Sequence, residues 1–114
     1  KFDSSFFLIG WGVPTLDSLY TLQSHLHTVG TGGDGNWNYG KYSNPKVDAI
    51  IDRLKTESNF EKRAALTEEA LKIHKADFGH IPLHHQVIPW AMRSNVFTTH
   101  RADNRMHAKW TSLK

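Results

Sequence analysis

The stretch NYGKYSNPKVDAIIDRL, residues 38–54, carries the clearest structural signal of the sequence. Asn44 can cap a helix, and Pro45 suits its first position because the N–H that proline lacks has no partner there. An apolar face follows at i, i+3, i+4 and i+7, made of Val47, Ile50, Ile51 and Leu54. The sequence therefore predicts a helix that packs this face against a core. The Asn, Tyr, Gly and Lys residues ahead of it show no such pattern, which raises the question of their purpose.

A loop and a second helix are predicted on either side of this helix. The loop spans residues 28–44 and holds Gly30, Gly32, Gly33, Gly35 and Gly40. A loop of this length inside a small domain is often functional. The second helix begins at a capping box of Ser58 and Glu61 and ends at Gly79. Its predicted apolar stripe consists of Phe60, Ala64, Thr67, Leu71, His74 and Phe78, widened by Ala70 and Ile73.

Two further segments have strand character. SFFLIGW, residues 5–11, is a continuous apolar run, as in strands that are buried on both faces. HIPLHHQVIPWAM, residues 80–92, alternates apolar side chains with others and contains prolines that restrict it to a sheet edge. Between the first strand and the loop, a helix capped by Thr15 is predicted near residues 16–27. This order of elements indicates an α/β or mixed α+β fold with too few strands to complete its own sheet.

The length of 114 residues is enough for one domain, which we expect to span residues 1–114. With 39% apolar and 22% charged residues, the composition is typical of a globular protein. The formal charge of +3 does not by itself indicate a nucleic-acid or membrane partner, and the lack of Cys excludes disulfides and thiolate metal sites. No apolar run reaches transmembrane length. Because the chain opens directly on a strand-like segment, we expect it to be a piece of a longer protein.

Eight histidines invite a metal site, but their spacing does not predict one. His84 and His85 would face opposite sides of a strand, and His25 and His27 are two apart on a helix and do not face each other. His74 lies on the apolar stripe, where a hydrogen-bonded core residue is expected. No zinc-enzyme motif and no nucleophile elbow is present. We therefore expect no metal, no cofactor and no catalysis, and any metal site would need residues far apart in the sequence.

Two other patterns have simpler interpretations. GTGGDG, residues 30–35, lacks the Lys-Ser/Thr pair and the following helix that a phosphate-binding loop needs, so a surface loop is expected. The tail from Arg93 onward is irregular and basic, with Trp110 expected to hold it to the domain. Dispersed charges of this kind favour a solvated segment. A small basic nucleic-acid-binding module is the alternative from another functional class.

The remaining candidates are aromatic residues beside glycines. GWGVPT places Trp11 between Gly10 and Gly12, and NWNYGKYSNP places Trp37 and Tyr39 ahead of the capped helix. Glycine lets a ligand approach the backbone, and aromatic rings suit the wall of a binding site. The alternative is that these aromatic residues only hold loops to the core, and composition alone does not decide between the two.

Taken in order, these motifs resemble the C-terminal part of the family 5 extracellular solute-binding proteins, the dipeptide-, oligopeptide- and nickel-binding receptors of bacterial ABC importers. The resemblance covers nearly the whole chain, and the order of the motifs is more specific than any one of them. The matching residues are Gly10, Trp11 and Gly12; Tyr42, Asn44, Pro45, Val47, Asp48, Ile50, Ile51 and Asp52; Arg63, Leu66 and Ala70; and Ile81, Pro82 and Leu83.

The resemblance implies the C-terminal portion of a periplasmic-binding-protein-like, two-lobed fold. Such a protein is not an enzyme. It is expected to be a monomer, periplasmic or held outside the cell by a lipid anchor, that captures a peptide or similar small polar solute between its lobes. It would deliver this solute to a membrane permease and have no nucleic-acid partner. A nickel-chelate or haem-binding receptor is the alternative within the same family.

The resemblance also implies where the ligand binds. Many peptide-binding members carry an Asp three residues after the Trp, where it pairs with the amino terminus of the peptide, whereas this sequence has Pro14 there. Asp17 is the candidate replacement. The expected ligand-binding residues are therefore Trp11, Gly12, Val13, Pro14, Thr15 and Asp17 from the first segment, with Trp37 and Tyr39 from the loop.

Overall fold

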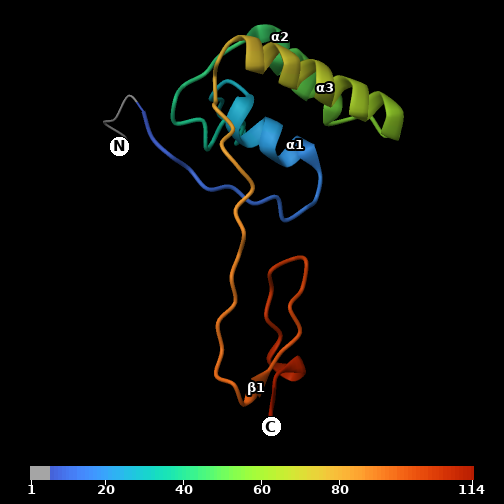
Figure 1. Cartoon of the computed structure of the whole chain (residues 1–114). Helices are drawn as coiled ribbons and strands as arrows, with labels where there is room; N and C mark the ends of the chain where they lie inside the picture. Colours follow the sequence, from blue (N-terminus) through green and yellow to red (C-terminus); the bar gives the residue numbers. More distant parts are fainter. Residues whose placement is uncertain (1–5) are drawn as a thin grey trace. The chain divides into compact units, whose positions relative to one another are not determined.

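The computed structural model describes residues 6–114, and the chain divides into two compact units between Pro82 and Leu83. Figure 1 shows the first unit as a group of helices and the second as a small hairpin with long connections. Among the described residues, no helix is long and apolar enough to cross a membrane. The expectation of one domain over residues 1–114 stays a prediction.

The described part of the chain is mostly helical. The first unit contains α1 (Ser18–Thr21), a π-helical turn (Leu22–Leu26), α2 (Pro45–Leu54) and α3 (Phe60–Ala76). The second unit contains β1 (Val96–Phe97), a 3-10 turn (Ala108–Trp110) and β2 (Ser112–Leu113). The two strands pair with each other in antiparallel register, Val96 opposite Leu113 and Phe97 opposite Ser112.

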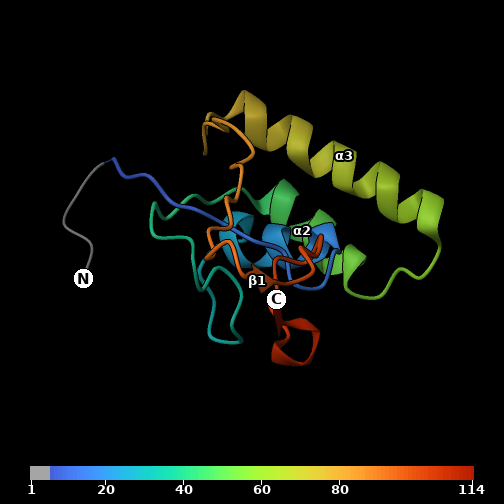
Figure 2. The ribbon, with the colours of Figure 1, turned by 60° about the horizontal axis from the view of Figure 1, so that its bottom comes forward.

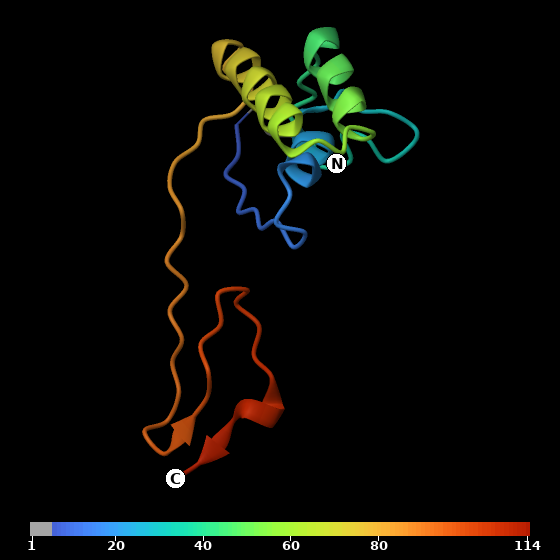
Figure 3. The same ribbon diagram turned by 90° about the vertical axis from the view of Figure 1, so that its right-hand side faces the viewer.

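Helix α2 confirms the prediction made from its caps and its apolar face. The Asn44 side chain accepts a hydrogen bond from the backbone N–H of Lys46 at 3.0 Å, and Pro45 occupies the first helical position. All four residues of the predicted face, Val47, Ile50, Ile51 and Leu54, are buried. They pack against α3 and the π-helical turn, and Figure 3 shows α2 and α3 side by side. The core of the first unit therefore centres on α2.

Helix α3 forms where predicted, but its start and its buried face differ from the prediction. Asn59 caps it by accepting from the N–H of Lys62, and the N–H of Asn59 in turn donates to the carboxylate of Glu57; the predicted capping box of Ser58 and Glu61 is wrong. The buried residues are Leu66, Ala70 and His74, with Ile73 partly buried. Phe60 and Phe78, at the two ends of the predicted stripe, are exposed. The face turned to α2 decides burial, and the sequence of α3 alone offers two overlapping stripes.

The helix predicted near residues 16–27 begins later and is wider than expected. Its cap is Asp17, whose Oδ1 accepts from the N–H of Leu19 at 2.8 Å, so the predicted start at 16 behind Thr15 is wrong. The π-helical turn then closes with the N–H of His27 donating to the carbonyl of Leu22. This wider turn buries Leu22 and Leu26 against α2.

The two predicted strands are not strands. In residues 6–11, Phe6 is 82% exposed and Leu8 78% exposed, and residues 80–92 form no regular element in Figure 1. Ser5, the first residue of the first predicted strand, lies outside the described residues. A strand needs a neighbour to take up its N–H and C=O groups, and among residues 6–114 the only strands pair with each other. The prediction of an α/β or mixed α+β fold is therefore confirmed for its helices and wrong for its two strands. The described chain is mostly helical with a short two-stranded hairpin.

The residues ahead of α2 have a structural purpose, which answers the question raised by their composition. Asn38 is buried; its Nδ2 donates to the carbonyls of His27 and Tyr42, and its Oδ1 accepts from the N–H of Tyr42. Gly35 has φ +65°, and a Cβ there would lie 2.5 Å from the carbonyl oxygen of His27, so only glycine fits. Figure 2 shows this loop in teal, projecting to one side of the helices before the chain enters α2. The run of Asn, Tyr and Gly thus fastens the loop to the end of the π-helical turn.

We expect the leucines of this unit to differ sharply in their contribution to stability. Leu54→Ala removes a fully buried side chain from the centre of the core and should lower the free energy of unfolding by about 2–5 kcal/mol. The matched control Leu71→Ala, at a position 48% exposed on α3, should lower it by less than about 1 kcal/mol. Urea unfolding of both variants measures the difference. Equal losses would show that α2 is not the centre of the core.

Candidate ligand-binding surface

The aromatic side chains that the sequence singled out come together in the first unit. Trp11 stacks on Tyr20 with ring centroids 5.4 Å apart and meets Trp37 edge-on at 5.6 Å, and Trp37 meets Tyr39 at 5.8 Å. The imidazole of His25 lies against the Trp11 ring at 4.0 Å. We refer to Trp11, Tyr20, Trp37 and Tyr39 as the aromatic cluster. It joins three segments: the apolar run, α1 and the loop before α2.

Hydrogen bonds hold the aromatic cluster in place. The indole N–H of Trp11 donates to Thr21 Oγ1 at 3.1 Å, and the backbone N–H of Trp37 donates to the carbonyl of Ser24 at 3.0 Å. Trp37 is nevertheless 40% exposed. Fixed rings with open faces can stack on planar or apolar groups and can attract cations through their π-systems. The arrangement therefore suits binding of a small molecule.

The other predicted binding residues form the link between Trp11 and α1. Gly12, Pro14 and Thr15 are exposed, and Val13 is half-buried, with its carbonyl accepting from the N–H of Leu16 at 3.2 Å. At Gly12 a Cβ would meet nothing within 4 Å, so this glycine has open space beside it. The link thus offers accessible backbone next to the cluster. Its role in binding stays a prediction.

Asp17 is engaged in the structure of the unit itself. One carboxylate oxygen accepts from the N–H of Leu19, and the other lies 2.7 Å from Nη2 of Arg63. Arg63 also donates to the carbonyls of Leu54 and Glu57, so it ties the start of α1 to the connection between α2 and α3. A carboxylate with both oxygens already paired is a poor partner for a ligand amine.

A groove of about 550 Å³ runs beside Asp17 and along α3, away from the aromatic cluster. Leu16, Phe60 and Leu71 supply apolar surface, and Lys72 and Lys75 supply positive charge. None of the residues of the aromatic cluster contributes to it. The groove is shallow and open to solvent, whereas the cluster consists of rings held by hydrogen bonds. We therefore base the candidate site on the cluster.

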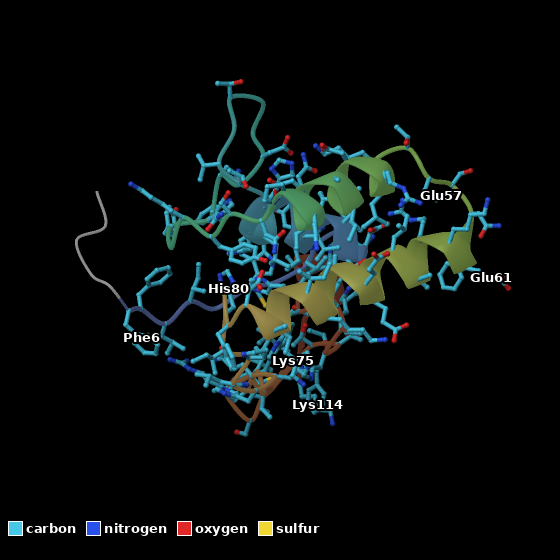
Figure 4. The ribbon with its side chains drawn as sticks, turned by 90° about the horizontal axis from the view of Figure 1, so that it is seen from above. Phe6, Glu57, Glu61, Lys75, His80 and Lys114 are labelled. Carbon is cyan, nitrogen blue, oxygen red and sulfur yellow. The ribbon has the colours of Figure 1, made fainter. Side chains whose placement is uncertain are left out.

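Three histidines form a second group that the sequence spacing did not reveal. His74 and His80 are joined by a hydrogen bond of 2.9 Å between Nε2 and Nδ1, and the His25 ring lies 6.0 Å from that of His80. Figure 4 shows His80 at the C-terminal end of α3. His74 is buried and hydrogen-bonded, as predicted. Gly79 is the sequence feature associated with this group. A Cβ at that position would lie 2.3 Å from the His74 ring, so glycine is required for the ring to pack there.

Burial keeps these histidines neutral. Burial, reinforced by the nearby His80 and opposed by Asp77, lowers the pKa of His74 to about 4. Burial also lowers the pKa of His80, and burial together with His80 lowers the pKa of His25. Protonation of any one of them would place a positive charge among apolar and aromatic side chains.

A cluster of polar and charged side chains is formed by residues from the loop of residues 28–44 and the segments on either side of it. His27, Asp34 and Asp52 each place one potential metal-ligand atom within 4.8 Å of those of the other two residues. The ammonium of Lys55 lies 3.0 Å from Asp34 and 2.8 Å from Asp52. The hydrogen bond from Lys55 lowers the pKa of Asp52; for Asp34, burial raises the pKa but hydrogen bonds from Lys55 and Gln23 outweigh it.

Three basic residues of the second unit contact aromatic rings of the same unit. Arg101 and Lys109 lie 4.9 and 5.3 Å from the ring centroid of Trp110, and Lys114 lies 4.0 Å from that of Phe97. Arg101 also pairs with Asp103. Trp110, expected to hold the tail, is 43% exposed and contacts these cations.

Comparison with protein-family models, with curated proteins and with solved structures finds no match to this chain. The resemblance to solute-binding proteins therefore stays a prediction. The physical grounds for a function are the aromatic cluster, the buried histidines and the His27 group.

We expect the stability of the first unit to fall as the pH drops from about 7 to 4. The unfolded chain takes up a proton on His74 near its ordinary pKa of 6.5, whereas the folded form resists protonation down to about 4. Stability from this residue is thus complete above pH 6.5 and is lost as the pH falls toward 4, by roughly 3 kcal/mol at most. Urea unfolding at several pH values, compared with His74→Gln, isolates this contribution.

The matched control is His84→Gln, which changes an exposed histidine and should leave the pH dependence as in the unaltered protein. Carboxylates with lowered pKa values, such as Asp77, lose their contribution only below about pH 4 and do not interfere. Equal pH dependence in His74→Gln and the unaltered protein would contradict the assignment.

Proposed function

We propose that this chain belongs to the substrate-binding component of an ABC importer and that it captures a peptide or similar small polar solute for delivery to a membrane permease. The observation that carries the proposal is the aromatic cluster, which includes the glycine-flanked Trp11 of the segment that the resemblance marks as ligand-binding. In this proposal the protein acts outside the cytoplasm and performs no catalysis.

The geometry of the cluster supports ligand binding in physical terms. Its rings are already held by the bonds from Trp11 to Thr21 and from Trp37 to Ser24, so a ligand would not need to order them. Sites prepared in this way bind more tightly because little conformational entropy is lost on association. The exposed glycine link next to Trp11 adds N–H and C=O groups that can bind a polar solute.

The exposure of two apolar segments is the second argument for the proposal, because it suggests pairing with a second lobe. Residues 6–11 and 80–92 have the sequence of strands, yet large apolar side chains such as Phe6, Leu83 and Val87 are exposed. Apolar strand sequences become stable when a neighbouring strand takes up their backbone groups. We propose that these runs pair with strands of a second lobe, and that closure of the two lobes traps the solute against the aromatic cluster.

The chemistry of Asp17 narrows the proposed ligand. Its two carboxylate oxygens are taken by Leu19 and Arg63, and Pro14 has no charge to offer an amine. We therefore propose that recognition depends on stacking and backbone hydrogen bonds rather than on an ion pair between Asp17 and the amino terminus of a peptide. Asp17→Asn should then weaken folding and leave affinity for the solute unchanged.

The test identifies the ligand first and then removes one ring. Native mass spectrometry of the natural full-length protein, purified without refolding, reveals the bound solute. Calorimetry with that solute then compares Trp37→Ala with the matched control Trp90→Ala in the second unit. We expect Trp37→Ala to weaken binding by about tenfold or more, because a buried aromatic contact contributes on the order of 1–3 kcal/mol. Trp90→Ala should bind as the unaltered protein does.

Several outcomes would separate this proposal from its alternatives. A spread of peptide masses, or one defined small solute, supports it. A nickel chelate or a haem as the bound species would favour the other receptor type of the same family. Salt-sensitive affinity for DNA or RNA without any solute would contradict the proposal and favour a basic nucleic-acid-binding module. Equal affinities of the Trp37→Ala and Trp90→Ala variants would show that the aromatic cluster is not the site.

A further inference from the structure

The His27 ring has a fixed tautomer. Its Nδ1 lies 2.7 Å from the carbonyl oxygen of Thr28. A carbonyl oxygen can only accept a hydrogen bond, so Nδ1 carries the hydrogen, and in the neutral ring Nε2 presents a lone pair. This is the arrangement found in metal-binding histidines, where one nitrogen donates to a carbonyl and the other binds the ion.

The Nε2 atom of His27 has no partner that matches its lone pair. It is buried and has no hydrogen-bond partner among the described residues, and the His27 side chain as a whole is 13% exposed. Asp52 Oδ1 lies 3.6 Å away, too far for a hydrogen bond and also an acceptor. Two acceptors that face each other in a partly buried site repel unless a cation lies between them.

Three separate segments supply the ligand atoms. His27 follows the π-helical turn directly, Asp34 lies in the loop before α2, and Asp52 lies on the last turn of α2; one ligand atom from each falls within 4.8 Å of the others. Further contacts orient them. Gln23 Nε2 donates to Asp34 Oδ1 at 2.8 Å, and Asp48 accepts from the backbone N–H and the hydroxyl of Thr28. Such supporting bonds place metal ligands accurately.

Lys55 shows that this position attracts positive charge. Its ammonium bridges Asp34 Oδ2 and Asp52 Oδ1, and the side chain is 30% exposed, so it can move out into solvent. An ammonium cannot satisfy His27 Nε2 as well, since no contact joins the two. A metal ion at the same place would bind both carboxylates and the imidazole together.

We propose that His27, Asp34 and Asp52 form a binding site for a divalent transition-metal ion, with Lys55 as the cation that the metal displaces. One imidazole nitrogen and two carboxylate oxygens suit Zn²⁺ and its first-row neighbours, which accept mixed nitrogen and oxygen ligands. Three protein ligands leave at least one position for water. The site shares no residue with the aromatic cluster, so the proposal does not depend on the proposed function.

The test is a titration of the full chain with Zn²⁺ alone, followed by calorimetry, for the unaltered protein and two variants. Asp52→Asn removes one ligand at a position that is 59% exposed, so the fold should survive, which circular dichroism checks. We expect one saturable site in the unaltered protein and at least about tenfold weaker binding in Asp52→Asn. Lys55→Met removes the competing ammonium and should bind Zn²⁺ more tightly than the unaltered protein.

The control variants are His84→Gln and His85→Gln, which remove exposed histidines outside the site and should leave the affinity unchanged. The combination of weaker binding in Asp52→Asn and tighter binding in Lys55→Met supports the proposal, since a purely structural role for the Asp52–Lys55 pair gives no reason for the second effect. Absence of saturable binding, equal affinity in Asp52→Asn, or loss of binding in either histidine control would overturn it.

Discussion

Burial of one face of α2 is the interaction on which the first unit depends. Val47, Ile51 and Leu54 are completely buried, and they meet Leu66 and Ala70 of α3 on one side and the π-helical turn on the other. This contact brings together α2, α3 and the π-helical turn. Burying these side chains also offsets the entropy lost in ordering the loop of residues 28–44, which has no helix or strand of its own.

Two sets of hydrogen bonds fix the loop of residues 28–44 next to α2 and the π-helical turn. Asp48, in the first turn of α2, accepts from the N–H and the hydroxyl of Thr28, and Asn38 binds the backbone of His27 and Tyr42. Buried groups of this kind destabilise the fold if they lose their partners, so they fix one conformation of the loop. Trp37 and Asp34 therefore stand at defined places although each belongs to an irregular segment.

The sequence predicts the parts of this structure whose cause is local. The cap at Asn44, the proline after it and the spacing of four apolar residues all act within one helix, so α2 follows from them directly. The buried face of α3 depends on where α2 lies, and Phe60 and Leu66 are equally apolar in the sequence. The prediction therefore included Phe60 and Phe78, which are exposed, and omitted Leu66. It was right for Ala70, Ile73 and His74. The apolar runs at 6–11 and 80–92 failed as strands for a similar reason, because a strand depends on a neighbour that the pattern of one segment cannot supply.

The same distinction between local and long-range causes applies to the candidate sites. Trp11, Trp37 and Tyr39 could be singled out because an aromatic residue beside a glycine is visible in the sequence, but their meeting with Tyr20 depends on the loop path. The group of His27, Asp34 and Asp52 has no spacing signal, since its members come from a helix end, a loop and a second helix. Thr28 connects its members to α2: Asp48 accepts from the N–H and hydroxyl of Thr28, and the carbonyl of Thr28 lies 2.7 Å from His27 Nδ1, while Nε2 lies 3.6 Å from Asp52. The backbone carbonyl of Thr28 thus determines the tautomer of His27, and Thr28 is itself bonded to a carboxylate in the first turn of α2.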